Sequence, residues 1–422
     1  MKKKLISVIC ALTLTAAMLA GCSSSSSSDT SDETEETTEE TAEEEEEAAE
    51  EETEEAEEET AEEETEEETS EGSAALKIAI VSSPSGVDDG SFNENNYEGI
   101  LEFIDENPDS TVTAVKEETG DTAACIQTVE DIVADYDVIV CCGYQFAAIG
   151  DVAEANPDVY FILVDSSATD SEGNENDYDN IYAMSFKEQE SGFLAGIAAA
   201  MSTSTGKVAV VNGIAYPSNV NYQWGFESGV NYANTNLGTS AEIVEIASYA
   251  GTDVTGADVG GNYIGSFSDQ STGKIIGEAL ISEGVDIIFV AAGDAGNGVF
   301  TAVKEATTTD NPIYVIGCDV DQYDDGASGD VNIILTSALK VMDVNVYRQL
   351  NAIADGTFEG GTYTLGADTD STGYVSEEGR CQLSDEAIEA IDAAYELVKD
   401  GTIVPAANFN GLTPEDFTGL NG

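Results

Sequence analysis

Carboxylates directly follow an apolar run late in the chain. The segment PIYVIG (312–317) has the composition of a buried strand, and IGCDVDQ (316–322) then brings Asp319 and Asp321. Polar residues just past a buried strand of an α/β sheet usually mark a binding site. The chain has no histidine, so the side chain that most often acts as a general base is missing. We therefore expect Asp319 to bind ligand hydroxyls and to take no part in bond making.

A second charged group, Lys340, ends the stretch LTSALK (335–340). A carboxylate and an ammonium that converge on one cleft suit vicinal hydroxyls, which donate to the first and accept from the second. Catalytic patterns are weak, because the chain has no G-x-S-x-G motif and a histidine-based triad is excluded. Paired carboxylates such as Asp88 and Asp89 arise by chance among 85 acidic residues. We expect a binding protein with no catalytic residue, no metal and no cofactor.

Two aromatic residues stand in polar loops that precede helix-like segments. Phe92 lies in DDGSFNENN and Phe267 in GSFSDQSTG. A ring exposed at the carboxyl edge of a sheet suits stacking on a planar ligand, and two such rings can enclose one. Alternatively, Phe92 covers its own helix and a preceding aspartate caps that helix. The residues alone favour neither interpretation.

A glycine-rich stretch, AAGDAGNGVFTAVKEA (291–306), leads into another helix-like segment. Gly293, Gly296 and Gly298 let the backbone approach a ligand and offer amide donors at a helix start. The stretch lacks the G-K-[ST] ending of a phosphate-binding P-loop. It therefore indicates close backbone contact with a ligand more than it indicates a nucleotide phosphate site.

Short apolar runs alternate with helix-like segments from residue 76 onward. The predicted strands are 77–81, 136–142, 159–165, 180–186, 206–212, 285–292 and 312–317, and clear helical spacing occurs over 93–107, 190–202 and 222–235. Such alternation predicts an α/β protein with parallel sheets covered on both faces. We divide the folded part into an N-terminal lobe (74–184 plus 337–358) and a C-terminal lobe (185–336 plus 359–422), joined by several crossings.

The N-terminus has the pattern of an export signal. Lys2 to Lys4 precede an apolar stretch, and Leu19-Ala20-Gly21-Cys22 ends it. This ending resembles a bacterial lipobox, which implies cleavage before Cys22 and acylation of its thiol. A plain secretory peptide is the alternative. We expect residues 1–22 to be a lipoprotein signal peptide and the protein to be held at the outer face of the cell membrane by lipid alone.

Residues 23–73 form a Ser/Thr/Glu-rich segment with 27 acidic residues between Asp29 and Glu71 and no basic ones. Like charges at this density favour a disordered tether. Residues 74–422 still carry 58 acidic against 10 basic residues, which argues against nucleic acid as a partner. The cysteines of this part (Cys125, Cys141, Cys142, Cys318 and Cys381) show no C-x-x-C spacing, and their disulfide state stays open.

Several motifs, in order over roughly 76–405, resemble the basic membrane protein family of lipoproteins, the PnrA-like branch of substrate-binding proteins. GVDDGSFNENNYEG (86–99) is similar to the family's G-V-D-D-K-S-F-N-Q-x-x-W-E-G. AAGDAGNGVFTAVKE follows A-A-G-G-T-G-x-G-V-x-x-A-A-K, and VIGCDVDQ follows V-I-G-x-D-x-D-Q. ILTSALKVMDVNVY is similar to the segment that carries the family's ligand lysine.

The resemblance implies a type I periplasmic-binding-protein fold that closes on a purine nucleoside and serves an ABC importer. Phe92 and Phe267 would then stack on the base, and Asn93 would hydrogen-bond its edge. The ribose would be held by the backbone of Gly293 together with Asp319 and Lys340. Asp88 is a further ligand-binding candidate.

Two positions depart from the family pattern on the base side. Ser83 and Ala148 stand where the family commonly has aspartates. Loss of two charged acceptors weakens recognition of a purine edge, since such hydrogen bonds are worth about 1.5–3 kcal/mol each. Tyr144 and Gln145 are the candidates to replace them.

We thus expect a monomeric, lipid-anchored solute-binding protein that delivers a nucleoside to separate ABC permease and ATPase subunits. A ligand-sensing surface receptor of the same fold, coupled to signalling, is one alternative. A sugar-binding protein is another, because it would use the same carboxylate and aromatic residues without a base.

Overall fold

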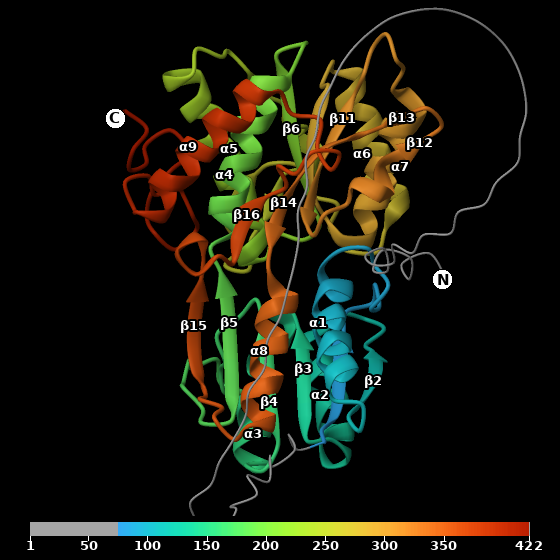
Figure 1. The fold of residues 1–422 in the computed structure, drawn as a ribbon, viewed down its shortest axis with the longest axis vertical. Helices are drawn as coiled ribbons and strands as arrows, with labels where there is room; N and C mark the ends of the chain where they lie inside the picture. Colours follow the sequence, from blue (N-terminus) through green and yellow to red (C-terminus); the bar gives the residue numbers. More distant parts are fainter. Residues whose placement is uncertain (1–74, 422) are drawn as a thin grey trace, which may run out of the picture. The chain divides into compact units, whose positions relative to one another are not determined.

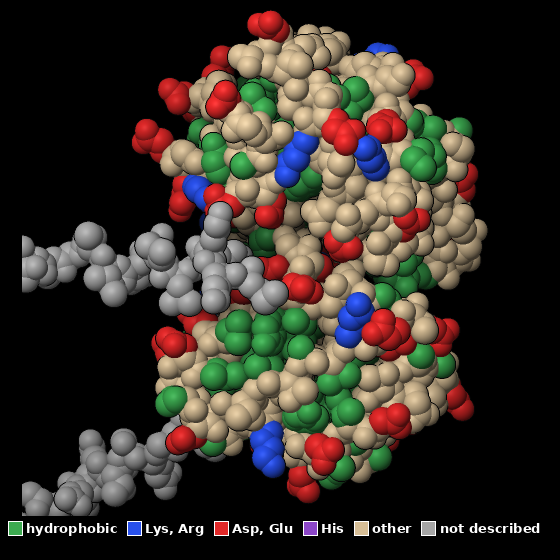
Figure 2. Space-filling view, turned by 90° about the vertical axis from the view of Figure 1, so that its right-hand side faces the viewer, with side chains coloured by type: hydrophobic (Ala, Val, Ile, Leu, Met, Phe, Trp, Pro, Cys, Tyr) green, Lys and Arg blue, Asp and Glu red, His purple; other side chains and the backbone are tan. Residues whose placement is uncertain are grey.

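The computed structural model describes residues 75–421. The signal peptide and lipobox, and the acidic tether, lie outside the described residues. The described part forms two α/β lobes, each built around a six-stranded sheet (Figure 1). Asp and Glu side chains are spread over both lobes, with Lys and Arg scattered between them (Figure 2). No helix among residues 75–421 is both long and apolar enough to cross a membrane.

The N-terminal lobe has the strand order β15-β5-β4-β3-β1-β2, all parallel. Its elements are β1 (Lys77–Ser82), α1 (Phe92–Glu106), β2 (Thr111–Lys116), α2 (Thr122–Ile132), η1 (Val133–Asp135), β3 (Val138–Cys142), η2 (Tyr144–Ile149), α3 (Gly150–Ala155), β4 (Tyr160–Val164), β5 (Ile181–Phe186), α8 (Met342–Ala354) and β15 (Gly361–Leu365). Because side chains alternate along a strand, Ile78 and Ile80 pack under α1 and α8, while Ala79 and Val81 pack under α2.

The C-terminal lobe has the strand order β16-β14-β11-β10-β6-β7, in which only β16 is antiparallel to its neighbour. Its elements are α4 (Glu188–Ser202), β6 (Lys207–Asn212), α5 (Pro217–Asn236), β7 (Glu242–Ile243), η3 (Ala247–Tyr249), β8 (Gly251–Thr252), β9 (Asp258–Gly260), α6 (Gln270–Ser282), β10 (Ile287–Ala291), η4 (Gly293–Ala295), α7 (Gly296–Ala306), β11 (Tyr314–Asp319), η5 (Tyr323–Gly326), β12 (Ala327–Ser328), β13 (Val331–Asn332), β14 (Ile334–Lys340), η6 (Ala367–Thr369), β16 (Thr372–Tyr374) and α9 (Asp385–Lys399). Helices α4, α5 and α9 cover one face of this sheet, and α6 and α7 cover the other. Both lobes are therefore doubly wound, as the sequence predicts.

The chain passes between the lobes three times within the described residues: from β5 to α4, from β14 to α8, and from β15 to η6 and β16 (Figure 1). The seven predicted strands all occur, with ends within two residues of the prediction. The predicted lobe boundaries are wrong in three places. Residues 185 and 186 complete β5 of the N-terminal sheet. Residues 337–340 belong to β14 of the C-terminal sheet, and residues 361–365 form β15, which pairs with β5 in the N-terminal sheet.

All five cysteines in the described part are free. Cys125, Cys141, Cys142 and Cys318 are buried, and Cys381 is partly exposed. The first four fill the sheets and the helix layer beneath them as small apolar side chains.

Helices α4 and α5 pack closely through facing glycines. A Cβ added at Gly196 would lie 2.1 Å from the carbonyl oxygen of Phe226, and one added at Gly229 would lie 2.0 Å from that of Phe193. Any side chain at these positions forces the two helices apart, so the glycines fix the spacing on which the helix layer of this lobe depends.

We expect Gly196→Ala to lower the free energy of unfolding by about 1–3 kcal/mol, because the added methyl group overpacks the contact between α4 and α5. Urea denaturation followed by circular dichroism measures this change. Thr235→Ala, at an exposed position of α5, is the control and should stay within about 0.5 kcal/mol of the parent protein. Equal stabilities of the two variants would contradict the packing argument.

Candidate functional site

A cavity lies where the carboxyl ends of the two sheets face each other. The space between protein atoms there is about 580 Å³, partly open to solvent, a size typical of small-molecule sites. It is lined by Ser83, Ser85, Asp89, Phe92, Asn93, Cys142, Gly143, Tyr144, Gln145, Asp165, Tyr216, Ser218, Asn219, Tyr222, Phe267, Ala291, Gly293, Cys318, Asp319 and Lys340. Both lobes contribute, so a ligand bound here contacts both at once.

The start of α1 forms one wall of the cavity. Asp89 Oδ1 accepts hydrogen bonds from the backbone N–H groups of Ser91 and Glu94, both at 3.1 Å, and Asp89 Oδ2 accepts from the backbone N–H of Asn93 at 3.2 Å. The carboxylate thereby satisfies free donors at the helix start. Burial raises the pKa of Asp89 to about 6, although these hydrogen bonds oppose the shift. Asp89 thus fixes the helix turn that presents Phe92 and Asn93 to the cavity.

The amide of Asn93 has a defined orientation. Its Nδ2 donates to Asp89 Oδ2 at 2.7 Å and to Ser83 Oγ at 3.0 Å. Because a carboxylate can only accept, the nitrogen must point toward Asp89. The buried Oδ1 of Asn93 has no hydrogen-bond partner. Asn93 lines the cavity, and its Oδ1 is a buried acceptor that the fold leaves without a partner.

Aromatic side chains line the cavity from both lobes. The edge of the Phe267 ring lies against Gly213, where an added Cβ would come within 2.3 Å of ring atoms. The carbonyl oxygen of Phe267 accepts from the backbone N–H of Ala295 at 2.8 Å, which anchors the loop. Tyr216 bridges the lobes, with ring centroids 6.0 Å from Phe267 and 5.3 Å from Tyr144 of the N-terminal lobe.

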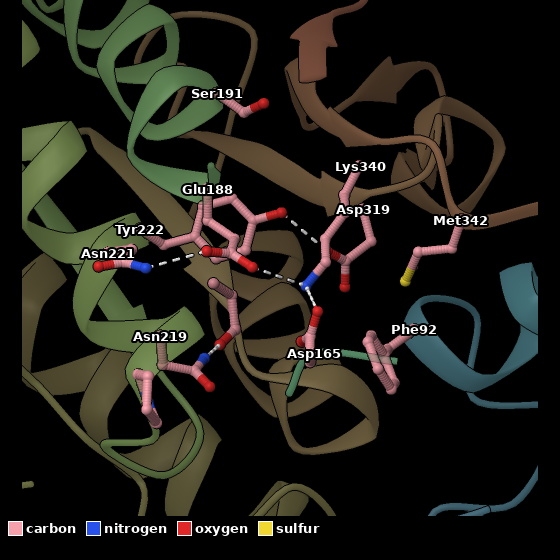
Figure 3. A network of polar contacts seen from close by, with 12 residues as sticks. Phe92, Asp165, Glu188, Ser191, Asn219, Asn221, Tyr222, Asp319, Lys340 and Met342 are labelled. Atoms are coloured by element: carbon pink, nitrogen blue, oxygen red, sulfur yellow. Dashed lines mark hydrogen bonds and ion pairs between the residues drawn. The ribbon is translucent and has the colours of Figure 1, made fainter. Parts of the chain in front are cut away.

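Asp319, at the end of β11, is held by neutral donors. Tyr222 donates its hydroxyl to Oδ1 at 2.8 Å (Figure 3). Ser91, from the other lobe, donates its hydroxyl to Oδ2 at 3.1 Å. Each carboxylate oxygen can accept a further hydrogen bond. The geometry therefore leaves Asp319 able to accept from ligand hydroxyls.

Lys340, at the end of β14, is almost completely buried, with a side-chain exposure of 2%. Its Nζ lies 2.5 Å from Asp165 Oδ1 and 3.3 Å from Glu188 Oε1, and 5.1 Å from the centroid of the Phe92 ring (Figure 3). Burial alone would lower the lysine pKa, but the carboxylates of Asp165, Glu188 and Asp319 together raise it. Burial raises the pKa of Glu188 to about 7 and also raises that of Asp165. The ammonium stays protonated between these carboxylates.

Two aspartates that line the cavity have left-handed backbones. Asp165, just after β4, has φ 66°, and Asp319, the last residue of β11, has φ 69°. Such conformations cost a non-glycine residue on the order of 1–3 kcal/mol and cluster at functional sites. The strain marks both aspartates as residues that the surrounding structure holds in place.

Most of the predicted site residues lie together. Phe92, Asn93, Tyr144, Phe267, Gly293, Asp319 and Lys340 line one cavity, while Asp88 is exposed and lies outside it. The reason is that the neighbouring Asp89 is the residue turned inward to cap α1. Ala148 does not line the cavity either, whereas Tyr144 and Gln145 of the same segment do.

Sequence reasoning missed Asp165, Glu188 and Tyr222. Asp165 follows an apolar strand just as Asp319 does, so the same rule would have found it. Tyr222 begins a predicted helical segment and Glu188 lies just before another, and neither gave a separate signal. Ser337 stands three residues before Lys340, an S-x-x-K spacing found in some acyl-transfer enzymes, but residues three apart on a strand point to opposite faces.

Two doubly wound lobes that enclose a polar and aromatic cavity at their facing carboxyl edges define a solute-binding protein of the type I periplasmic-binding fold. The solved structure of an ABC transporter solute-binding protein from Aeropyrum pernix K1 has this fold. It matches 80% of this chain and 94% of its own with a TM-score of 0.66 and 24% sequence identity.

Residues 76–407 match the Bmp family, described as "ABC transporter substrate-binding protein PnrA-like", and the chain belongs to this family of extracytoplasmic, non-enzymatic binding proteins. A CD4+ T-cell-stimulating antigen of Listeria monocytogenes is 29% identical over 78% of this chain and 88% of its own length. An ABC transporter nucleoside-binding protein BmpA of Lactococcus lactis is 29% identical over 68% of this chain and 77% of its own length.

We expect Asp89 to make the protein less stable as the pH rises from about 4 to about 6. Its pKa is raised in the folded state from an ordinary value near 3.8, so the folded protein binds this proton more tightly than the unfolded chain does. Stability from this group is fully present below pH 4 and is lost as the pH rises through 6, by up to about 1.4 kcal/mol per pH unit.

Unfolding free energies measured by denaturation between pH 4 and 7.5 test this expectation. Asp89→Asn should flatten the profile, whatever its effect on absolute stability. Asp88→Asn removes an exposed carboxyl from the same loop and is the matched control. Identical slopes for the two variants would contradict the assignment to Asp89.

Proposed function

We propose that this protein captures a nucleoside, most simply a purine nucleoside, between its lobes and delivers it to an ABC importer. The observation that carries the proposal is that one cavity combines aromatic rings from both lobes with a carboxylate and an ammonium. Rings suit a flat heterocycle, and the charged pair suits a vicinal diol. The Lactococcus lactis relative named as nucleoside-binding supports this assignment.

On the base side, Phe92 and Phe267 stack on the heterocycle, and Asn93 accepts from one of its N–H groups. The unused Oδ1 of Asn93 supports this role, since a buried acceptor without a partner costs about 1–3 kcal/mol that a ligand donor would recover. Ser83, Tyr144 and Gln145 complete a base edge without a free carboxylate, because Asp89 is committed to α1.

On the sugar side, Asp319 accepts from the hydroxyls and Lys340 donates to their oxygens, with the backbone of Gly293 alongside. Gly293 has φ 53°, a left-handed conformation that favours glycine, and it lines the cavity wall next to Phe267. Closure of the lobes around the solute would produce the form that docks on the permease.

Membrane attachment is part of the same proposal. The lipobox-like ending at Cys22 supports acylation of that thiol, which would hold the folded part outside the cell membrane through the acidic segment 23–73.

We expect calorimetry of the full chain to show binding of adenosine, guanosine or inosine and much weaker binding of free ribose. Asp319→Ala should weaken nucleoside binding by about 2 kcal/mol, roughly 30-fold, because a charged acceptor is lost from buried hydroxyls. Asp321→Asn, which alters the Arg380 ion pair in the same loop outside the cavity, is the control. Tight binding of ribose alone would instead favour a sugar-binding protein.

Phe267→Ala should weaken nucleoside binding by about 1–2 kcal/mol while leaving the weak binding of ribose unchanged, because only the base stacks on the ring. Competition titrations with adenosine and with ribose measure the two losses. Phe409→Ala removes a phenylalanine that is 62% exposed and should alter neither. Equal losses for nucleoside and sugar would argue against stacking.

Cys22→Ser should abolish incorporation of radiolabelled palmitate and release the protein from the membrane fraction of expressing bacteria. Cys381→Ser, at a partly exposed cysteine of the folded part, should leave both unchanged. Membrane retention of the Cys22→Ser protein would contradict anchoring by lipid at this residue.

A further inference from the structure

Lys340 has one ion pair within its own lobe and one ion pair that crosses to the other lobe. Glu188 begins α4, which packs in the C-terminal lobe, and its Oε2 accepts from Asn221 of α5 in the same lobe at 3.0 Å. Asp165 follows β4 of the N-terminal lobe. Glu188 therefore holds the ammonium within the lobe that carries it, whereas the 2.5 Å contact with Asp165 crosses from one lobe to the other.

Asp165 is fixed in its own lobe by the backbone. Its N–H donates to the carbonyl oxygen of Met184 at 2.8 Å, and the carbonyl oxygen of Val164 before it accepts from Gly143 at 3.1 Å. These bonds hold the left-handed turn at Asp165, which takes the chain out of the strand direction at the cavity edge. The carboxylate thus reaches the ammonium only when the lobes are as close as they are here.

A lysine ammonium has three N–H donors in fixed relative directions. Asp165 Oδ1 and Glu188 Oε1 lie 2.5 Å and 3.3 Å from Nζ as ion pairs, and Lys340 also lines the cavity beside Asp319. The two carboxylates consequently decide where the ammonium group lies in the cavity wall. Among the described residues, no other lysine or arginine lies within ion-pair distance of Asp165 or Glu188. No second cation can therefore replace Lys340 beside these two carboxylates.

We propose that Asp165 is a positioning residue for ligand capture: its ion pair with Lys340 forms when the lobes close, holds the lysine ammonium toward the ligand, and must break before the ligand leaves. The part that concerns the ligand rests on the proposed function. Asp165 acts through Lys340, so its loss raises the rate of dissociation, while association, which begins in the open form, changes little.

The kinetic test uses the full chain and the nucleoside that binds best among adenosine, guanosine and inosine. Stopped-flow measurement should show dissociation from Asp165→Asn faster by about tenfold or more, with association within about twofold. Asp368→Asn, which alters an exposed ion pair with Lys187 at another crossover, is the matched control and should leave both rates unchanged.

A double-mutant cycle separates positioning from a merely structural role. In a Lys340→Met background, Asp165→Asn should add little to the dissociation rate, because its effect passes through the lysine. Fully additive effects would overturn the proposal, as would an Asp165→Asn protein that releases the nucleoside at the parent rate.

A ligand-free measurement separates this inference from the proposed function. Spin labels at Leu101→Cys on α1 and Ile275→Cys on α6, both at exposed positions, report the distance between the lobes in a Cys22→Ser, Cys381→Ser background. Asp165→Asn should shift the ligand-free distribution to longer distances. If the parent protein binds no nucleoside but this shift occurs, the nucleoside assignment fails and the closure role stands; an unchanged distribution overturns the closure role.

Discussion

A buried ammonium group is the constraint on which the centre of this structure depends. Moving a lone charge out of water costs several kcal/mol, and the cost is offset only by close, well-aligned partners of opposite charge. Lys340 meets this condition through Asp165 and Glu188. The end of β14, the start of α4 and the turn after β4 must therefore lie together, and with them the facing edges of both sheets. The cavity walls follow from that arrangement.

The same end of α4 also gathers the crossovers. Glu190 Oε2 accepts from the backbone N–H of Ala367 at 2.7 Å and from the hydroxyl of Thr372 at 2.8 Å, just after β15. Ser191 donates its hydroxyl to the carbonyl oxygen of Leu339 at 2.7 Å, at the end of β14. Three separate chain crossings are thus tied to one helix turn.

The sequence predicted those parts of the fold whose environment is simplest. Strands β1, β3, β4, β6, β10 and β11 are covered on both faces and are apolar except at their ends, so each can be recognised from its own sequence. By contrast, GTYTL of β15 lies at a sheet edge with alternating exposure, and nothing in its pattern says which sheet it joins. The aromatic and glycine loops of the site could be predicted from family motifs. The partners of Lys340 could not, because they arise from pairing among distant segments.

Asp165 and Asp319 hold corresponding places in the two lobes, yet their surroundings give them different tasks. Asp165 pairs with the ammonium group of Lys340, so its negative charge is balanced within the protein. Asp319 is held by hydroxyl donors from Tyr222 and Ser91, which orient a carboxylate without neutralising it. Only the arrangement around Asp319 leaves a charged acceptor that can still bind a solute. Because the Ser91 hydroxyl comes from the opposite lobe, that acceptor is fully oriented when the lobes are together, which couples the proposed binding of ligand hydroxyls to closure.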